Sequence, residues 1–442
     1  MVVAAVEVAD SVPAEGDPAG SAGLSDTMTQ ATEGAAPTGP SMAAAPRGAW
    51  RNVGILALCQ GFAMTANSLV LATSALVGSA LADNQAFATL PIAMQMLSTM
   101  TFTIPASLFM GRFGRRAGFL LAAAVGVTAG GLAAFAIMQG RFGLFSVAAI
   151  LFGAFNAFGN YFRFAAVDVA GPAFAGRAVS LVLAGGVLAA FAGPNLASFT
   201  RELVSSAEFA GSYMAVIGVY LLAFGALMFL EIPKPGRREY AGSGRPLRSI
   251  AAQPGFVVAA LAGMLGYGVM SLVMTATPLA MKADSFAFGS TAFVIQWHIV
   301  GMFAPSFFTG RLIARFGLVR VMTVGAALEA ACTVVNLTGE GIFQYWASLV
   351  CLGVGWNFLF IGATTLLTRM HDDAEKAKTQ ALNDFLIFSM VAVASLSAGA
   401  LQGALGWRAV NLGVLPLVLI ILAALIWLRG RDRMEVAQSP AT

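Results

Sequence analysis

Long apolar stretches recur along the chain from residue 52 onward, each roughly 18–28 residues long and separated by short polar breaks. An apolar helix of about 20 residues crosses the ~30 Å hydrocarbon core of a bilayer, and it satisfies its own backbone polar groups there. The pattern therefore predicts an all-α membrane protein with twelve transmembrane helices. We expect these helices at residues 52–80, 86–110, 117–139, 142–168, 177–199, 211–231, 254–280, 288–311, 317–338, 342–367, 379–403 and 408–428.

The longest polar interruption separates six predicted helices from six. The first 46 residues contain no Lys or Arg and are rich in Ala, Gly, Ser, Thr and Pro. Such a segment buries too little apolar area to offset the entropy lost on ordering, and it lacks the basic start of a signal peptide. The expected organisation is a disordered cytoplasmic tail (1–49), an N-terminal six-helix bundle (50–231), a cytoplasmic linker (232–253), a C-terminal six-helix bundle (254–430) and a cytoplasmic tail (431–442).

Composition and charge agree with a membrane protein. Only 10% of the residues are charged, against about 25% in a typical soluble protein. The basic residues behind the net charge of +4 are dispersed between apolar runs, which argues against a nucleic-acid partner. If both termini are cytoplasmic, all but four of the 25 Lys and Arg residues lie on the cytoplasmic side, as the positive-inside rule requires. We therefore expect a multi-pass protein of the bacterial inner membrane.

Other protein classes find little support in the sequence. The three cysteines, Cys59, Cys332 and Cys351, lie inside apolar runs without a Cys-x-x-Cys pair, so we interpret them as small buried side chains. No Ser/His/Asp set, phosphate-binding loop or carboxylate pair indicates an enzyme. The short loops leave no room for a soluble sensory or assembly module.

Two loops in corresponding positions of the two halves are related in sequence. Gly114 and Gly317 lie 203 residues apart, and aligning them places Arg112 opposite Arg315. A repeat of this kind fits two six-helix bundles related by an axis along the membrane normal. Both loops resemble the G-x-x-x-D-R-x-G-R-R signature of the major facilitator superfamily. The matching residues are Arg112, Gly114, Arg115 and Arg116 in the first copy and Gly310, Arg315 and Gly317 in the second.

The resemblance implies the major facilitator fold over residues 50–430 and assigns these residues to conformational loops. The usual Asp of the signature is missing, because Gly111 and Ala314 occupy its positions. The salt bridge that this Asp makes between the two halves in the family is therefore not expected here.

Four residues inside predicted helices form two i, i+4 pairs. Met270 and Met274 share a face of the seventh helix, and His298 and Met302 share a face of the eighth. Thioethers suit Cu(I), which also accepts imidazole, better than they suit hard ions or Zn²⁺. Two other interpretations remain open on the residues alone. Methionine is a common packing residue in apolar helices, and a histidine within the membrane can carry a proton or bond a substrate.

The two pairs together resemble the paired motif of the CcoA-like bacterial copper importers, including the 28-residue step from Met270 to His298. This resemblance implies a secondary transporter that imports copper, expected as Cu(I) at the site, across the bacterial inner membrane for the biogenesis of cbb3-type cytochrome oxidase. It implies copper as the transported substrate, no permanently bound cofactor, and a cytoplasmic copper acceptor as a partner besides the lipid bilayer. The alternative is a proton-coupled exporter of drugs or small metabolites, with His298 as its proton carrier and the methionines as an adaptable wall.

Further polar residues lie within predicted helices. Glu329 is a candidate for proton coupling or a hydrogen-bonded structural acid, and Gln60, Asn67 and Asn156 either line the transport cavity or bond between helices. Near the cytoplasmic end of the fourth helix, we expect Arg163 and Asp168 to form a structural pair that faces Arg177.

Overall fold

The computed structural model describes residues 48–170, 175–232, 245–372 and 375–438, and in these ranges the secondary structure consists of helices. The N-terminal half contains α1 (Ala49–Leu81), the short η1 (Gln85–Phe87), α2 (Leu90–Phe113), α3 (Arg115–Met138), α4 (Phe142–Gly159), α5 (Phe162–Ala170), α6 (Ala175–Thr200) and α7 (Ala210–Met228). The C-terminal half contains α8 (Leu247–Ala251), α9 (Pro254–Ala283), α10 (Phe288–Phe303), α11 (Ser306–Phe316), α12 (Leu318–Leu337), α13 (Ile342–Thr368) and α14 (Lys376–Gln438).

Each of the twelve predicted membrane spans falls on helix in this structure. Nine helical segments of the described chain are long and apolar enough to cross a membrane, and α10 with α11 forms a tenth, bent by 45°. The last two predicted spans are joined in α14, which is broken at Gly406 by a positive φ of 76°. Of the predicted tail at 1–49, residues 1–47 lie outside the described residues, as do residues 233–244 of the predicted linker and 439–442 of the predicted C-terminal tail. Residues 431–438, predicted as tail, are helical and belong to α14.

The bend between α10 and α11 has an identifiable cause. Pro305 has no backbone N–H and interrupts the helical hydrogen bonds there. The side chain of Asn357 on α13 supports the bend from both sides, because its Nδ2 donates to the Met302 carbonyl and to Ser306 Oγ, each at 2.7 Å. Broken helices are tolerated at membrane depth when neighbouring side chains satisfy the freed groups in this way.

Two apolar cores organise the molecule, one in each half. Buried residues from Ala49 to Leu230 form most of the first core, and those from Ile250 to Leu428 form most of the second. Small residues allow the closest helix contacts. A Cβ on Gly185 of α6 would lie 3.0 Å from the Gly61 nitrogen of α1, and one on Gly353 of α13 would lie 2.5 Å from the His298 carbonyl of α10. Substitution at these glycines would therefore push helices apart.

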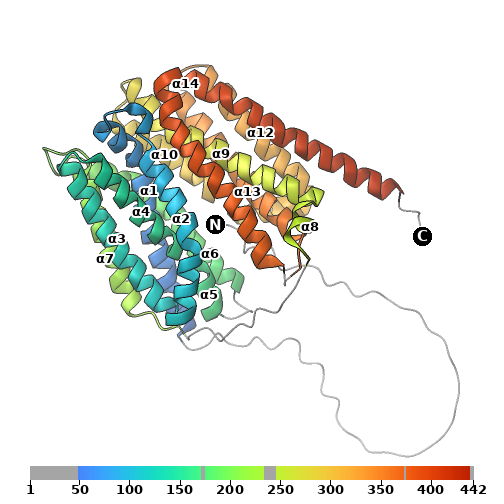
Figure 1. Ribbon diagram of the computed structural model, residues 1–442, viewed down its shortest axis with the longest axis horizontal. Coiled ribbons are helices and arrows are strands. Elements are labelled where there is room, and N and C mark those ends of the chain that lie inside the picture. Colours follow the sequence, from blue (N-terminus) through green and yellow to red (C-terminus); the bar gives the residue numbers. More distant parts are fainter. Residues whose placement is uncertain (1–47, 171–174, 233–244, 373–374, 439–442) are drawn as a thin grey trace, which may run out of the picture.

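Contacts between the halves gather at one end of the molecule. Thr89 Oγ1 donates to the Leu396 carbonyl at 3.2 Å and accepts from the Gly399 nitrogen at 3.1 Å. Phe209 and Phe288 also meet edge to face across the halves. We call this the closed end, and the other end, which carries α8 and the loops at Gly114 and Gly317, the linker end (Figure 1). At the linker end, the Arg163 guanidinium on α5 lies within electrostatic range of Asp384 on α14.

Candidate functional site

His298 is completely buried on α10 and turned toward α13. Its Nδ1 lies 2.8 Å from the Leu349 carbonyl oxygen. A carbonyl can only accept, so in the neutral ring Nδ1 carries the proton and Nε2 presents its lone pair. Nε2 has no hydrogen-bond partner among the described residues. Metal-binding histidines commonly have this arrangement, in which one ring nitrogen is fixed by an oxygen and the other is free to bind.

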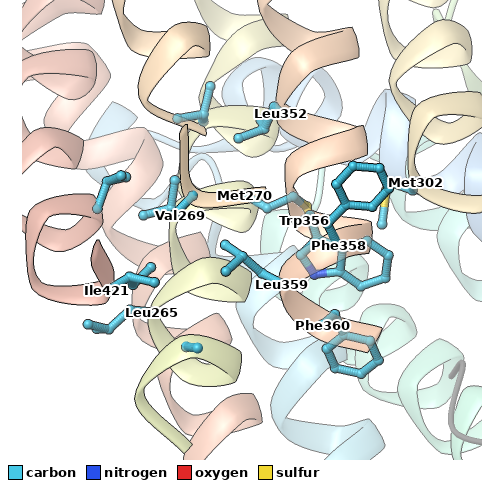
Figure 2. Close-up of a cluster of buried hydrophobic side chains, with 14 of the residues drawn as sticks. Leu265, Val269, Met270, Met302, Leu352, Trp356, Phe358, Leu359, Phe360 and Ile421 are labelled. Atoms are coloured by element: carbon cyan, nitrogen blue, oxygen red, sulfur yellow. The ribbon is translucent and has the colours of Figure 1, made fainter. Parts of the chain in front are cut away.

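The three candidate methionines are buried in the same apolar core. Met270 and Met274 lie on α9 and Met302 lies on α10, one turn after His298. Figure 2 shows Met270 and Met302 in this core together with Trp356 of α13. Within the described ranges, no group of three or more His, Cys, Asp and Glu side chains comes together as a metal site. Any metal held here would therefore depend on thioether and imidazole donors. That all four side chains bind one ion stays a prediction.

An aromatic cluster next to these residues was not predicted from the sequence. Trp356 stacks on Phe360 of the same helix, with ring centroids 5.0 Å apart and planes 11° apart. Tyr267 of α9 meets both rings edge to face, at 5.1 and 5.6 Å, and Phe303 of α10 lies 6.3 Å from Trp356. The i, i+4 spacing of Trp356 and Phe360 was the one sequence signal that could have indicated that their rings stack. The cluster brings together aromatic rings from three helices, and Trp356 and Phe360 are buried in it.

Glu329 is fully buried on α12, and its side chain lies between glycines of two neighbouring helices. A Cβ on Gly266 of α9 would lie 3.5 Å from Glu329 Oε1, and one on Gly355 of α13 would lie 3.1 Å from its Cγ. Neither carboxyl oxygen has a hydrogen-bond partner in the described part of the chain. An unpaired buried charge is costly, so this conformation suits the neutral, protonated carboxyl. Gly266 precedes Met270 by one helical turn.

Two of the three predicted polar residues of the N-terminal half, Asn67 and Asn156, form hydrogen bonds between helices. Asn67 Oδ1 on α1 accepts from Gln95 Nε2 on α2 at 2.9 Å and from Asn156 Nδ2 on α4 at 3.0 Å. Gln60 is buried on α1. Of the two roles considered for Asn67 and Asn156, the hydrogen bonds support the structural one.

The two related loops have the same backbone conformation. Gly114 links α2 to α3 at φ 91° and ψ 156°, and Gly317 links α11 to α12 at φ 89° and ψ 148°. These angles favour glycine, because other residues are strained at such a φ. In both loops an arginine lies over the ring of the phenylalanine that follows it. Arg112 Cζ is 5.5 Å from the centroid of the Phe113 ring, and Arg315 Cζ is 5.4 Å from that of Phe316.

The expected pair between Arg163 and Asp168 is wrong. Asp168 Oδ2 lies 2.5 Å from Arg115 Nη2, so the loop motif rather than Arg163 neutralises this carboxylate. Arg163 instead lies over the Phe164 ring and faces Asp384 of the other half. Asp168 and Arg163 are five residues apart, and the helix between them directs the two side chains to different neighbours. The side chain of Arg177 lies outside the described residues.

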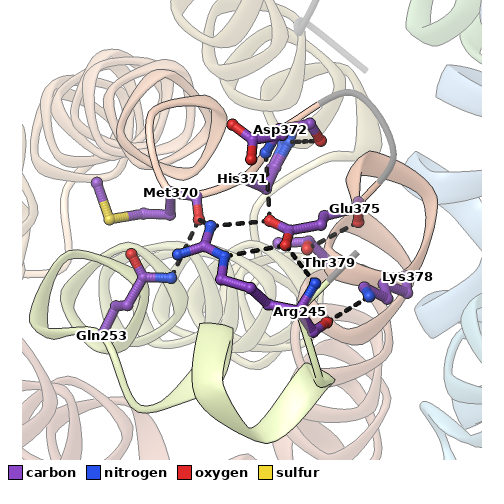
Figure 3. Close-up of polar contacts among 8 residues, drawn as sticks. All are labelled: Arg245, Gln253, Met370, His371, Asp372, Glu375, Lys378 and Thr379. Carbon is purple, nitrogen blue, oxygen red and sulfur yellow. Dashed lines mark hydrogen bonds and ion pairs between the residues drawn. The ribbon is translucent and has the colours of Figure 1, made fainter. Parts of the chain in front are cut away.

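A polar cluster fixes the described end of the linker to the C-terminal half (Figure 3). Arg245 contacts both oxygens of Glu375, with Nε at 2.9 Å from Oε1 and Nη2 at 2.8 Å from Oε2. Lys378 Nζ donates to the Arg245 carbonyl, and Gln253 Nε2 donates to that of Met370 at 3.1 Å. Hydrogen bonds from Arg245 lower the pKa of Glu375 from 4.5 to about 2.

Comparisons with known proteins agree with this architecture. The sequence model of the Major Facilitator Superfamily matches residues 259–442. The chain is 40% identical to the riboflavin transporter RfnT of Brucella anthropi over 391 residues, which cover 88% of this chain and 98% of that protein. It is 29% identical to YdeG, an uncharacterized MFS-type transporter of Bacillus subtilis, over 86% of this chain and 92% of that protein.

A solved structure shares the fold. The fucose:proton symporter FucP of E. coli superposes with a TM-score of 0.55 at 17% identity, covering 86% of this chain and 99% of FucP. The fold, the repeated glycine loops and the full-length relative lead to one conclusion. This chain is a multi-pass membrane transporter and not an enzyme, and it belongs to the major facilitator superfamily.

Proposed function

We propose that this transporter imports copper and that His298 is its principal ligand. The observation that carries the proposal is the buried imidazole, whose Nδ1 is fixed by the Leu349 carbonyl and whose Nε2 has no partner among the described residues. Soft sulfur donors from Met270, Met274 and Met302 would complete a neutral site for Cu(I). A neutral donor set favours a monovalent soft ion without holding it too tightly to be released.

Glu329 would supply proton coupling for this transport. Its buried carboxyl has no hydrogen-bond partner among the described residues. It lies beside Gly266, which precedes Met270 on α9 by one helical turn. When the halves rock apart and water reaches the group, the charged form becomes accessible. A proton taken up on one side and lost on the other would then accompany the cargo, as alternating access requires.

Copper uptake tests the site. Cells or vesicles containing the full chain are loaded with radioactive copper under reducing conditions, and His298→Gln, Met270→Leu and Met302→Leu are compared with the parent. Leucine has nearly the volume of methionine, so it removes the sulfur and largely keeps the packing. The matched control is Met322→Leu, a fully buried methionine of α12 that lies outside the two pairs. Normal uptake in the His298 and Met302 variants would refute the proposed site, and net efflux of copper would refute import.

Riboflavin is the second candidate cargo, and two observations favour it. A relative that is 40% identical over nearly its whole length is named a riboflavin transporter. The cluster of Tyr267, Phe303, Trp356 and Phe360 offers aromatic surfaces on which a flat isoalloxazine ring can stack.

The two cargos predict opposite results in one experiment. Riboflavin uptake is measured in a riboflavin-auxotrophic strain, in parallel with copper uptake, for the parent, His298→Gln and Phe360→Leu. If copper is the cargo, only copper uptake occurs and His298→Gln removes it. If riboflavin is the cargo, the parent supports growth on low riboflavin, Phe360→Leu weakens that growth, and copper uptake stays at background.

A further inference from the structure

The C-terminal half contains a cavity of about 650 Å³ at its linker end, away from the proposed transport site. It lies among the ends of α9, α11, α12, α13 and α14. Of the described residues that line it, none is acidic and four are arginines, namely Arg320, Arg369, Arg429 and Arg431. Several arginine side chains around one cavity create a positive potential that favours an anion.

The backbone of the repeated glycine loop adds to this preference. Gly317, Leu318 and Val319 line the same cavity. They form the start of α12, a helix of 20 residues, and Gly317 has no side chain with which to cap it. The first N–H groups of a helix lack intrahelical partners and carry a partial positive charge, which favours a phosphate or carboxylate.

The remaining walls are apolar. Phe316, Leu366 and Leu428 line the cavity beside the arginines. One turn of α14 nearby, Ile426 and Trp427 are 67% and 51% exposed on a helix that is apolar enough to span the membrane. The cavity thus offers a cationic region for a headgroup next to surfaces suited to acyl chains. A water-soluble anion would gain nothing from the apolar walls.

We propose that this cavity binds the phosphate headgroup of an anionic phospholipid from the surrounding leaflet. Basic cavities between the ends of membrane helices are suited to such headgroups. The bound lipid would connect α12, α13 and α14 at their linker ends, and this role does not depend on which cargo the transporter carries.

Lipid retention in native mass spectrometry tests the proposal. The full chain is purified in detergent with equimolar phosphatidylglycerol and phosphatidylcholine of the same acyl chains, and the retained lipids are counted. We expect the parent to retain phosphatidylglycerol preferentially. In Arg320→Gln/Arg369→Gln we expect about 30-fold weaker retention, since each arginine near an anionic lipid contributes about fivefold. The control Arg248→Gln/Arg311→Gln removes the same charge at the same end outside the cavity, and it should retain the lipid as the parent does.

Three results would overturn the proposal: equal retention of the two lipids by the parent, equal loss in the control pair, or displacement of phosphatidylglycerol by millimolar inorganic phosphate. The last result would identify a site for a free anion. If the double variant is recovered poorly, Arg369→Gln alone is the test, with an expected loss of about fivefold.

Discussion

The buried polar groups of the two halves are satisfied to different degrees. In the N-terminal half, Asn67 accepts hydrogen bonds from Gln95 and Asn156, and the Tyr213 hydroxyl lies 3.2 and 3.1 Å from Thr73 Oγ1 and Ser74 Oγ. These contacts join α1 to α2, α4 and α7. The side chains in these contacts neither titrate easily nor bind metals, and their role is structural.

In the C-terminal half, the buried side-chain atoms that have no hydrogen-bond partner among the described residues include some from groups that bind protons or metal ions. They include His298 Nε2 and both carboxyl oxygens of Glu329. Polar groups inside a membrane are costly, so those kept without a partner are candidates for function. We therefore expect the hydrogen bonds around Asn67 and Tyr213 to serve as a structural frame, and we expect the transport chemistry at His298 and Glu329.

The largest effect is expected from His298→Gln. Glutamine can still bond the Leu349 carbonyl but offers no imidazole nitrogen. Because loss of a mere supporting partner of a metal ligand costs about 10–100-fold in affinity, loss of the ligand should lower copper uptake at least that far. Uptake of radioactive copper at equal protein levels measures this, and an unchanged rate would show that His298 is a packing residue like its neighbours.

A smaller effect is expected from Glu329→Gln, which keeps the shape and removes the titratable proton. We expect transport to become insensitive to an imposed pH gradient and to slow about tenfold, which is less than the roughly 10²–10⁴-fold that a proton-transferring group supplies to a catalysed reaction. The thermal midpoint should change little, since the carboxyl makes no hydrogen bond in the described structure. Uptake with and without a pH gradient is the measurement, and a variant that still responds to the gradient would place coupling elsewhere.

Substitution at Asn67 should lower stability without changing transport, which is the reverse of the effect expected from Glu329→Gln. Asn67→Leu removes the acceptor of two buried hydrogen bonds and leaves Gln95 and Asn156 with unpaired donors, at a cost of about 1–3 kcal/mol each. We expect a thermal midpoint lower by several degrees and an unchanged Michaelis constant for the cargo. Thermal unfolding in detergent measures the midpoint, and uptake kinetics measure the Michaelis constant. A changed Michaelis constant at unchanged stability would mean that Asn67 lines the transport path.

The helices were predictable because the bilayer fixes their length and the lipid-facing side chains fix their composition. The breaks inside these helices were harder to predict from the sequence. Pro305 gave a sequence signal for the bend between α10 and α11, whereas the break after Gly159 depends on packing. The loop repeat was predictable because a positive φ selects glycine at Gly114 and Gly317.

The site was only partly predictable for a related reason. The i, i+4 spacing places His298 and Met302 on one helix face whatever the tertiary structure. The bond from Nδ1 to Leu349 joins residues 51 positions apart, and the pocket of Glu329 is formed by glycines on two other helices. Contacts of this kind depend on how α9, α12 and α13 pack against one another. The local sequence pattern of a single helix does not determine that packing. The partner of Asp168 was missed for the same reason.

The smallest effect is expected at Glu375, a charged group that is fully paired outside the membrane. Its pKa is lowered from 4.5 to about 2 by Arg245, so its contribution to stability is present above pH 4.5 and is lost as the pH falls toward 2. Glu375→Gln should therefore loosen α8 at neutral pH, seen as several-fold faster hydrogen exchange at Leu247–Ala251, with the transport rate unchanged. The difference from the parent should narrow below pH 4.5, whereas Glu340→Gln at the closed end should show no difference at any pH. If the difference in hydrogen exchange persists undiminished at pH 2, the ion pair is not its cause. If Glu375→Gln abolishes transport, the polar cluster around Arg245 takes part in transport and is not only structural.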